Sequence, residues 1–83
     1  MFLQISELEG HYEIVSLVGT LADVAHLHIS LSDKDGHVIG GHVLDSLIVF
    51  TTAELVIGEC TDYHMTRELD PKTGFPELSI KKS

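Results

Sequence analysis

The sequence has little cysteine, few basic residues and no long apolar run, and each shortage excludes a class of protein. A single cysteine, Cys60, excludes an intramolecular disulfide and suits the reducing cytoplasm. No apolar stretch approaches the ~20 residues of a membrane span. The N-terminus lacks the basic and apolar regions of a secretion signal. We therefore expect a cytoplasmic protein without a membrane segment.

Basic residues number only five against 13 acidic residues, which gives a formal net charge of −8. They are scattered or near the C-terminal end: Lys34, Arg67, Lys72, Lys81 and Lys82. Nucleic-acid binding needs a positive surface that releases counterions from phosphates. Direct binding of nucleic acid by this chain is therefore disfavoured.

Helical periodicity is also missing, and the 83 residues suffice for one small domain, residues 1–83. Runs of β-branched and alternating apolar residues predict strands at residues 12–20, 24–32, 37–44, 51–59 and 62–69. Gly19 is expected to mark a strand end or a bulge, and residues 75–83 to dock as a tail. Without an amphipathic helix, such a sheet must bury its apolar face against another sheet or a partner. The pattern therefore predicts a nearly all-β chain. Its sheet closes into a compact barrel, is covered by other subunits or belongs to a fragment, and the exposed edges favour self-association.

The segment at residues 25–31 (AHLHISL) is where we expect chemistry. Successive side chains of a strand point to opposite faces, so His26, His28 and Ser30 share one face. The alternate apolar residues share the other, which we interpret as the core face. A third histidine, His42, follows a short hairpin and is preceded by two glycines that allow close approach of a ligand or another backbone.

The hairpin turn decides on which face His42 lies. Residues 33–36 (DKDG) combine Asp at the first turn position with Gly where positive φ is needed. If Gly36 is the left-handed bulge residue of a type I turn, Asp33 pairs with His37. A loop shorter by one residue would turn His42 to the opposite face.

In the longer-loop register, His28 lies opposite His42 with Cβ atoms roughly 5 Å apart. His26 lies on the same face, about 7 Å away. Three imidazoles so placed can hold zinc through bonds of about 2.0–2.1 Å and leave a position open for water or substrate. The alternative is that these histidines only line a polar pocket or an interface.

Motifs in order along the chain resemble the plants-and-prokaryotes-conserved (PPC) domain, also called DUF296. They are residues 10–20 (GHYEIVSLVGT), 25–31 (AHLHISL), 35–42 (DGHVIGGH), 52–59 (TAELVIGE) and 67–78 (RELDPKTGFPEL). The resemblance implies an α+β fold, a mainly antiparallel sheet flanked by a helix, that assembles as a homotrimer. It also implies that this chain represents mainly the sheet portion of a domain lacking its N-terminal strand and helix.

The resemblance further implies bound metal at His26, His28 and His42, with zinc or another divalent transition metal and a small-molecule ligand. One alternative function is a DNA-associated regulatory or scaffold protein, although the AT-hook that binds DNA in plant relatives is absent. Another is a metal-dependent hydrolase or lyase. Glu54 is a candidate general base for such an enzyme, but the sequence does not place it near the metal, and no catalytic residue is assigned.

Overall fold

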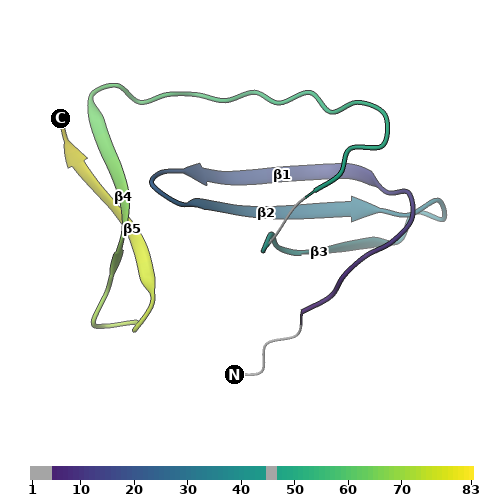
Figure 1. The fold of residues 1–83 in the computed structure, drawn as a ribbon, viewed down its shortest axis with the longest axis horizontal. Coiled ribbons are helices and arrows are strands. Elements are labelled where there is room, and N and C mark those ends of the chain that lie inside the picture. The colour runs from purple at the N-terminus through teal and green to yellow at the C-terminus, as the bar shows by residue number, and fades with distance from the viewer. Residues whose placement is uncertain (1–4, 45–46) are drawn as a thin grey trace.

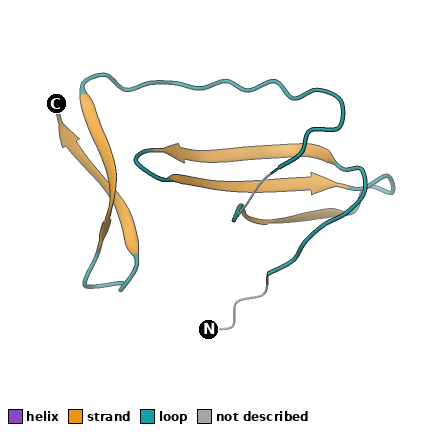
Figure 2. Cartoon of the chain, viewed as in Figure 1, coloured by secondary structure: helices purple, strands orange, loops and turns teal. Residues whose placement is uncertain are grey.

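The computed structural model describes residues 5–44 and 47–83, and this part of the chain consists of strands, turns and loops (Figure 1). Strands β1 (Glu13–Leu21), β2 (Ala25–Ser32) and β3 (Val38–His42) form an antiparallel sheet in that order. Strands β4 (Tyr63–Leu69) and β5 (Pro76–Lys82) form a second antiparallel pair. The described residues contain no helix (Figure 2), so the structure shows the predicted antiparallel sheet but not the helix of an α+β fold.

No helix in residues 5–44 or 47–83 is long and apolar enough to cross a membrane.

A bulge in β1 places Ile14 on the face of the first sheet opposite the histidines. The register between β1 and β2 shifts between Ile14, which pairs with Leu31, and Ser16, which pairs with Ser30. The extra residue, Val15, moves Ile14 to the same face as Leu31; without it, Ile14 would point to the histidine face. The bulge therefore adds one large apolar side chain to the face that carries Leu27, Ile29 and Leu31.

Gly19 lies inside β1, opposite Leu27, rather than at a strand end or a bulge, so that expectation was wrong. A Cβ atom added at Gly19 would stand 2.8 Å from the Cα of Leu27, closer than real Cβ contacts allow. Glycine is needed here because the two backbones lie close together, not because the chain turns.

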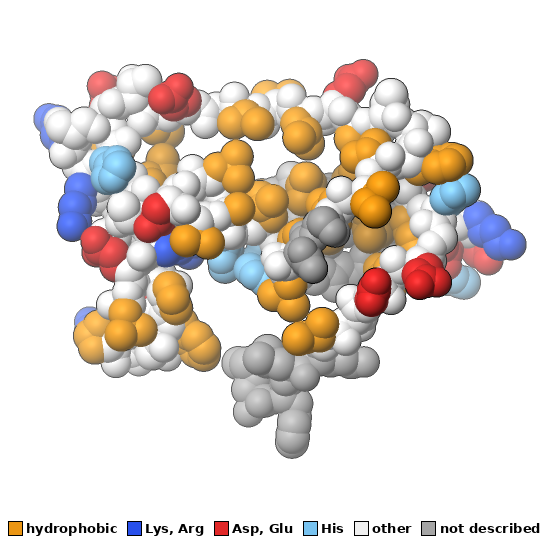
Figure 3. Space-filling view, viewed as in Figure 1, with side chains coloured by type: hydrophobic (Ala, Val, Ile, Leu, Met, Phe, Trp, Pro, Cys, Tyr) orange, Lys and Arg blue, Asp and Glu red, His pale blue; other side chains and the backbone are white. Residues whose placement is uncertain are grey.

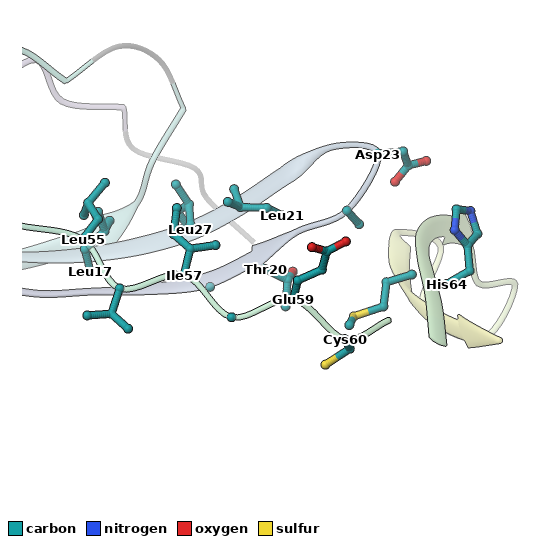
Figure 4. A pocket seen from close by; sticks show the side chains of 15 residues that line it. Leu17, Thr20, Leu21, Asp23, Leu27, Leu55, Ile57, Glu59, Cys60 and His64 are labelled. Carbon is teal, nitrogen blue, oxygen red and sulfur yellow. The ribbon is translucent and has the colours of Figure 1, made fainter. Parts of the chain in front are cut away.

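The strand predicted at residues 51–59 is not formed. The segment runs as an extended loop alongside β1 (Figure 1), and it has no place in either sheet. Its alternation is typical of a strand, but a strand also needs a backbone ladder, and this segment has none. Leu55 and Ile57 instead line an open cavity of about 840 Å³, together with Leu17 and Leu27 of the first sheet (Figure 4).

The C-terminal residues pair as a strand where a docking tail was predicted. β5 pairs with β4 from Leu69 opposite Pro76 to Tyr63 opposite Lys82. The turn between them is closed by hydrogen bonds from Gly74 N to Asp70 O (2.7 Å) and from Asp70 N to Phe75 O (3.0 Å). Gly74 has φ 76°, a left-handed conformation that favours glycine.

The described residues form no fully buried core. None of their apolar side chains is buried, and large ones such as Ile48 (94% exposed) and Phe50 (71%) lie open. Figure 3 shows apolar side chains spread over the visible face of the molecule. Such exposure of many large apolar side chains is typical of a surface that another molecule or subunit covers.

Candidate metal centre

Two neighbouring strands carry the three histidines. His26 and His28 are on β2, and His42 is the last residue of β3. The ladder places His28 directly opposite His42, the register predicted from the sequence. All three side chains therefore project from the same face of the first sheet, because residues directly opposite, or two apart on a strand, share a face.

The turn between β2 and β3 sets this register. Gly36 N donates to Asp33 O at 3.1 Å, and Asp33 N donates to His37 O at 3.0 Å. Gly36 has φ 81°, so it is the left-handed residue of the turn, as predicted. The Asp33 carboxylate oxygen Oδ1 also accepts from Asp35 N and His37 N, both at 2.9 Å. Local hydrogen bonding therefore fixes the loop length that brings His42 beside His28.

The three rings lie close enough to share one ion. Ring centroids are 5.2 Å apart for His26 and His28, 4.8 Å for His26 and His42, and 5.3 Å for His28 and His42. One ring nitrogen from each residue lies within 4.8 Å of the others. Nitrogens bound tetrahedrally to one zinc stand about 3.3 Å apart. Small side-chain rotations would close that difference, and three imidazoles are a donor set that zinc commonly takes.

The centre is open on its outer side. His26 is half-buried, whereas His28 and His42 are exposed. Gly40 pairs with Ser30 on the histidine face, where an added Cβ would stand 2.9 Å from the carbonyl oxygen of Ile29. Gly41 belongs to the other face, so only one of the two glycines adjoins the site.

The surroundings of His26 favour its neutral form. Partial burial lowers the pKa of His26 below its ordinary value, and the charges of Arg67, His42 and His28 lower it further. The carboxylate of Glu77 acts in the opposite direction. A neutral imidazole is the form that binds metal, so this environment suits a ligand.

Arg67 of β4 is the residue near the site that the sequence did not reveal. Its Nη2 donates to Thr20 Oγ1 at 2.9 Å, and Thr20 lies directly opposite His26 in the ladder between β1 and β2. In the sequence, Arg67 is one of five scattered basic residues. It is the only arginine of the chain, and this was the one feature of the sequence that distinguished it from the lysines. Its position depends on how the β4–β5 hairpin lies against the first sheet, and short-range patterns do not specify that.

A second group of possible ligands lies at the turn itself. Asp33, Asp35 and His37 have ligand atoms near one another. The Asp33 carboxylate is already engaged by two backbone donors, and its Oδ2 lies 3.2 Å from His37 Nδ1. These contacts shape the turn, and they account for the grouping without an ion.

Glu54 and the histidines outside these two groups lie apart from His26, His28 and His42. His11 stacks on Phe50 with ring centroids 3.8 Å apart. Glu54 is exposed in the extended segment, outside both groups of possible ligands. His64 is exposed on β4 and lines the 840 Å³ cavity. The structure brings together His26, His28 and His42 and does not join Glu54 to them.

The chain is thus a small β-sheet domain that carries three adjacent histidines, a candidate metal centre, on an open face. The sequence model of the Plants and Prokaryotes Conserved (PCC) domain matches residues 3–61, a span that contains all three histidines and the turn. The chain belongs to this family, as its motifs predicted.

Two curated relatives are similar over nearly the whole chain. "Bifunctional protein GlmU" of Synechococcus sp. (strain JA-3-3Ab) is 40% identical over 76 residues, which are 90% of this chain and 12% of that protein. "Bifunctional protein GlmU" of Synechococcus sp. (strain JA-2-3B'a(2-13)) is 39% identical over 75 residues, 89% of this chain and 12% of that protein. The chain thus spans only about an eighth of the length of these relatives.

Proposed function

We propose that this PCC-domain chain is a homotrimeric module that binds zinc or another divalent transition metal through His26, His28 and His42. The observation that carries the proposal is the convergence of three ring nitrogens within 4.8 Å on an exposed face. Three protein ligands leave a coordination position for a small ligand. The protein supplies the orientation through the β2–β3 register, and the ion would supply Lewis acidity.

Self-association is supported by the apolar surface. Large aliphatic side chains of both sheets and of the extended segment remain exposed in the single chain. Burying apolar area is worth roughly 25 cal/mol per Å², so copies of the chain that cover this surface gain stability. The trimer is the assembly that the family resemblance implies.

Cys60, which is exposed and free, fits the reducing cytoplasm.

The open position also supports a second candidate, a metal-dependent hydrolase or lyase. When bound by three histidines, zinc brings the pKa of a bound water to about 7. No carboxylate is among the described groups that share the histidine cluster, so we assign no general base. A DNA-associated scaffold is less favoured, because a net charge of −8 repels phosphates. Whatever the two GlmU relatives do as whole proteins is not carried over, because this chain matches only 12% of each.

Zinc content tests the proposal. After zinc loading and dialysis, we expect about one zinc per wild-type chain by mass spectrometry, since a site with three histidine ligands retains the ion. His28→Ala should lose the ion because it removes one of three ligands. His64→Ala removes an exposed histidine outside the cluster and should retain it. Equal zinc in both variants, or none in the wild type, would refute the proposed function.

A further inference from the structure

Arg67 is held beside the candidate metal centre. Its Nη2 donates to Thr20 Oγ1 at 2.9 Å. Thr20 pairs with His26, so the two side chains project from the same face with Cβ atoms roughly 5 Å apart. The guanidinium group therefore lies on the histidine face, next to the half-buried member of the cluster.

A second contact fixes the backbone at this position. Arg67 N donates to Asp23 Oδ1 at 2.9 Å, and the same oxygen accepts from Val24 N at 3.1 Å. Figure 4 shows Asp23 at the β1–β2 turn, on the side toward the β4–β5 hairpin. Arg67 is thus attached to the first sheet through both its backbone and its side chain, which places the guanidinium with little freedom.

No carboxylate neutralises this arginine within the described residues. The ion pairs found there join Lys81 to Glu68 and His37 to Asp33. The nearby carboxylate of Glu77, whose charge acts to raise the pKa of His26, is not ion-paired with Arg67. It accepts a hydrogen bond from Thr73 Oγ1 at 3.3 Å. The chain has 13 acidic residues, so an arginine left without one at this place calls for a physical reason.

The hydrogen-bonding capacity of Arg67 is also largely unused. Its Nε–H is shielded from solvent and has no acceptor among the described residues. Of its side-chain donors, only Nη2 has a protein acceptor there, Thr20. A divalent ion on three neutral imidazoles would add positive charge to the same face, and an anion between ion and guanidinium offsets this repulsion.

We infer that Arg67 binds an oxyanion, the carboxylate or phosphate group of a small ligand whose other oxygen takes the open position on the metal. The inference rests on the proposed metal centre and names the chemical class of its ligand. A planar guanidinium suits this role because it donates parallel hydrogen bonds to the oxygens of one carboxylate or phosphate. Arg67 is thus a ligand-binding residue and does not coordinate the ion.

Cobalt-loaded protein tests the inference without an activity assay. Cobalt(II) replaces zinc and gives a visible absorption spectrum that changes when a ligand enters its coordination sphere. We would titrate wild type and Arg67→Met with acetate and with inorganic phosphate. Arg67→Met should bind cobalt as wild type does but bind the tighter oxyanion at least about tenfold more weakly, since a charge-assisted hydrogen bond is lost. The anion that wild type binds more tightly, acetate or phosphate, shows whether the ligand group is a carboxylate or a phosphate.

Two further variants make the outcome decisive. Lys72→Met removes one positive charge from the β4–β5 turn and should leave oxyanion affinity unchanged. Arg67→Gln keeps a donor for Thr20 Oγ1, so it replaces Arg67→Met if that variant does not fold, with the same expected loss. Cobalt uptake with unchanged oxyanion affinity in the Arg67 variant overturns this inference alone. A wild type that takes up no cobalt overturns the inference together with the proposed function.

Discussion

His28 and His42 lie directly opposite each other in the ladder between β2 and β3, with ring centroids 5.3 Å apart. Their side chains share a face only because the connecting loop has the length that the turn at Asp33 and Gly36 imposes. The candidate centre therefore depends on the number of residues in one hairpin loop. Changing that number is a way to test the centre without altering a ligand.

Deletion of Lys34 should abolish metal binding although it removes no ligand. A hairpin loop shorter by one residue shifts the pairing by one and turns His42 to the apolar face. We expect zinc to be lost after dialysis, while Lys34→Gly, which keeps the loop length, retains it. Retained zinc in the deletion variant would show that the histidines do not depend on this register.

Replacing Gly36 should destabilise the protein through its backbone. At φ 81°, a side chain costs about 1–2 kcal/mol because its Cβ meets the following carbonyl oxygen. Gly36→Ala should lower the free energy of unfolding by about 1 kcal/mol in urea titrations. Gly36→Asn should lose less, because asparagine tolerates the left-handed region. Equal losses for both variants would contradict this account of the turn.

Gly40 should resist substitution more than its neighbour Gly41. A Cβ at Gly40 would stand 2.9 Å from the backbone oxygen of Ile29, whereas one at Gly41 meets no atom within 4 Å. Because backbone yields less readily than a side chain, Gly40→Ala should cost about 1–3 kcal/mol of unfolding free energy. Gly41→Ala is the matched control. The reverse ranking of the two variants would contradict the close approach of β2 and β3 at Gly40.

Acidification should destabilise the metal-free protein through His26. Burial and the nearby charges lower the pKa of His26 from 6.5, so the unfolded chain takes up this proton at a higher pH than the folded one. The contribution to stability is complete above pH 6.5 and is lost as the pH falls through the lower folded pKa.

Urea titrations at a series of pH values measure this effect. His26→Gln should flatten the decline of unfolding free energy below pH 6.5 relative to wild type. His64→Gln controls for the removal of one histidine elsewhere. An unchanged slope in His26→Gln would show that His26 does not link folding to pH.

The position of the three histidines could be predicted because it depends on one local turn. The elements around them could not, because their positions depend on contacts between distant parts of the chain. The turn at residues 33–36 carries its own signal in Asp33 and Gly36, so the sequence predicts the histidine register that the structure has. In contrast, nothing local says that the alternating residues 51–59 lack a ladder partner, and the predicted strand is absent.

Two other features needed the fold itself. Residues 75–83 were expected to dock as a tail, yet residues 76–82 form β5, which begins at Pro76, a position where the missing N–H is tolerated. Arg67 reaches Thr20 across 47 positions of sequence, and no periodicity or spacing encodes such a contact. The sequence therefore indicates the three candidate ligands, whereas the structure is needed to identify Arg67 as the positively charged side chain beside them.

X-ray absorption at the zinc edge of the loaded wild-type protein tests the central claim most directly. The account predicts three imidazole nitrogens at about 2.0–2.1 Å and a further oxygen or nitrogen ligand. The imidazole scattering should fall in a His42→Ala sample and stay unchanged in His64→Ala. A first shell of oxygen atoms without imidazole scattering would contradict the account.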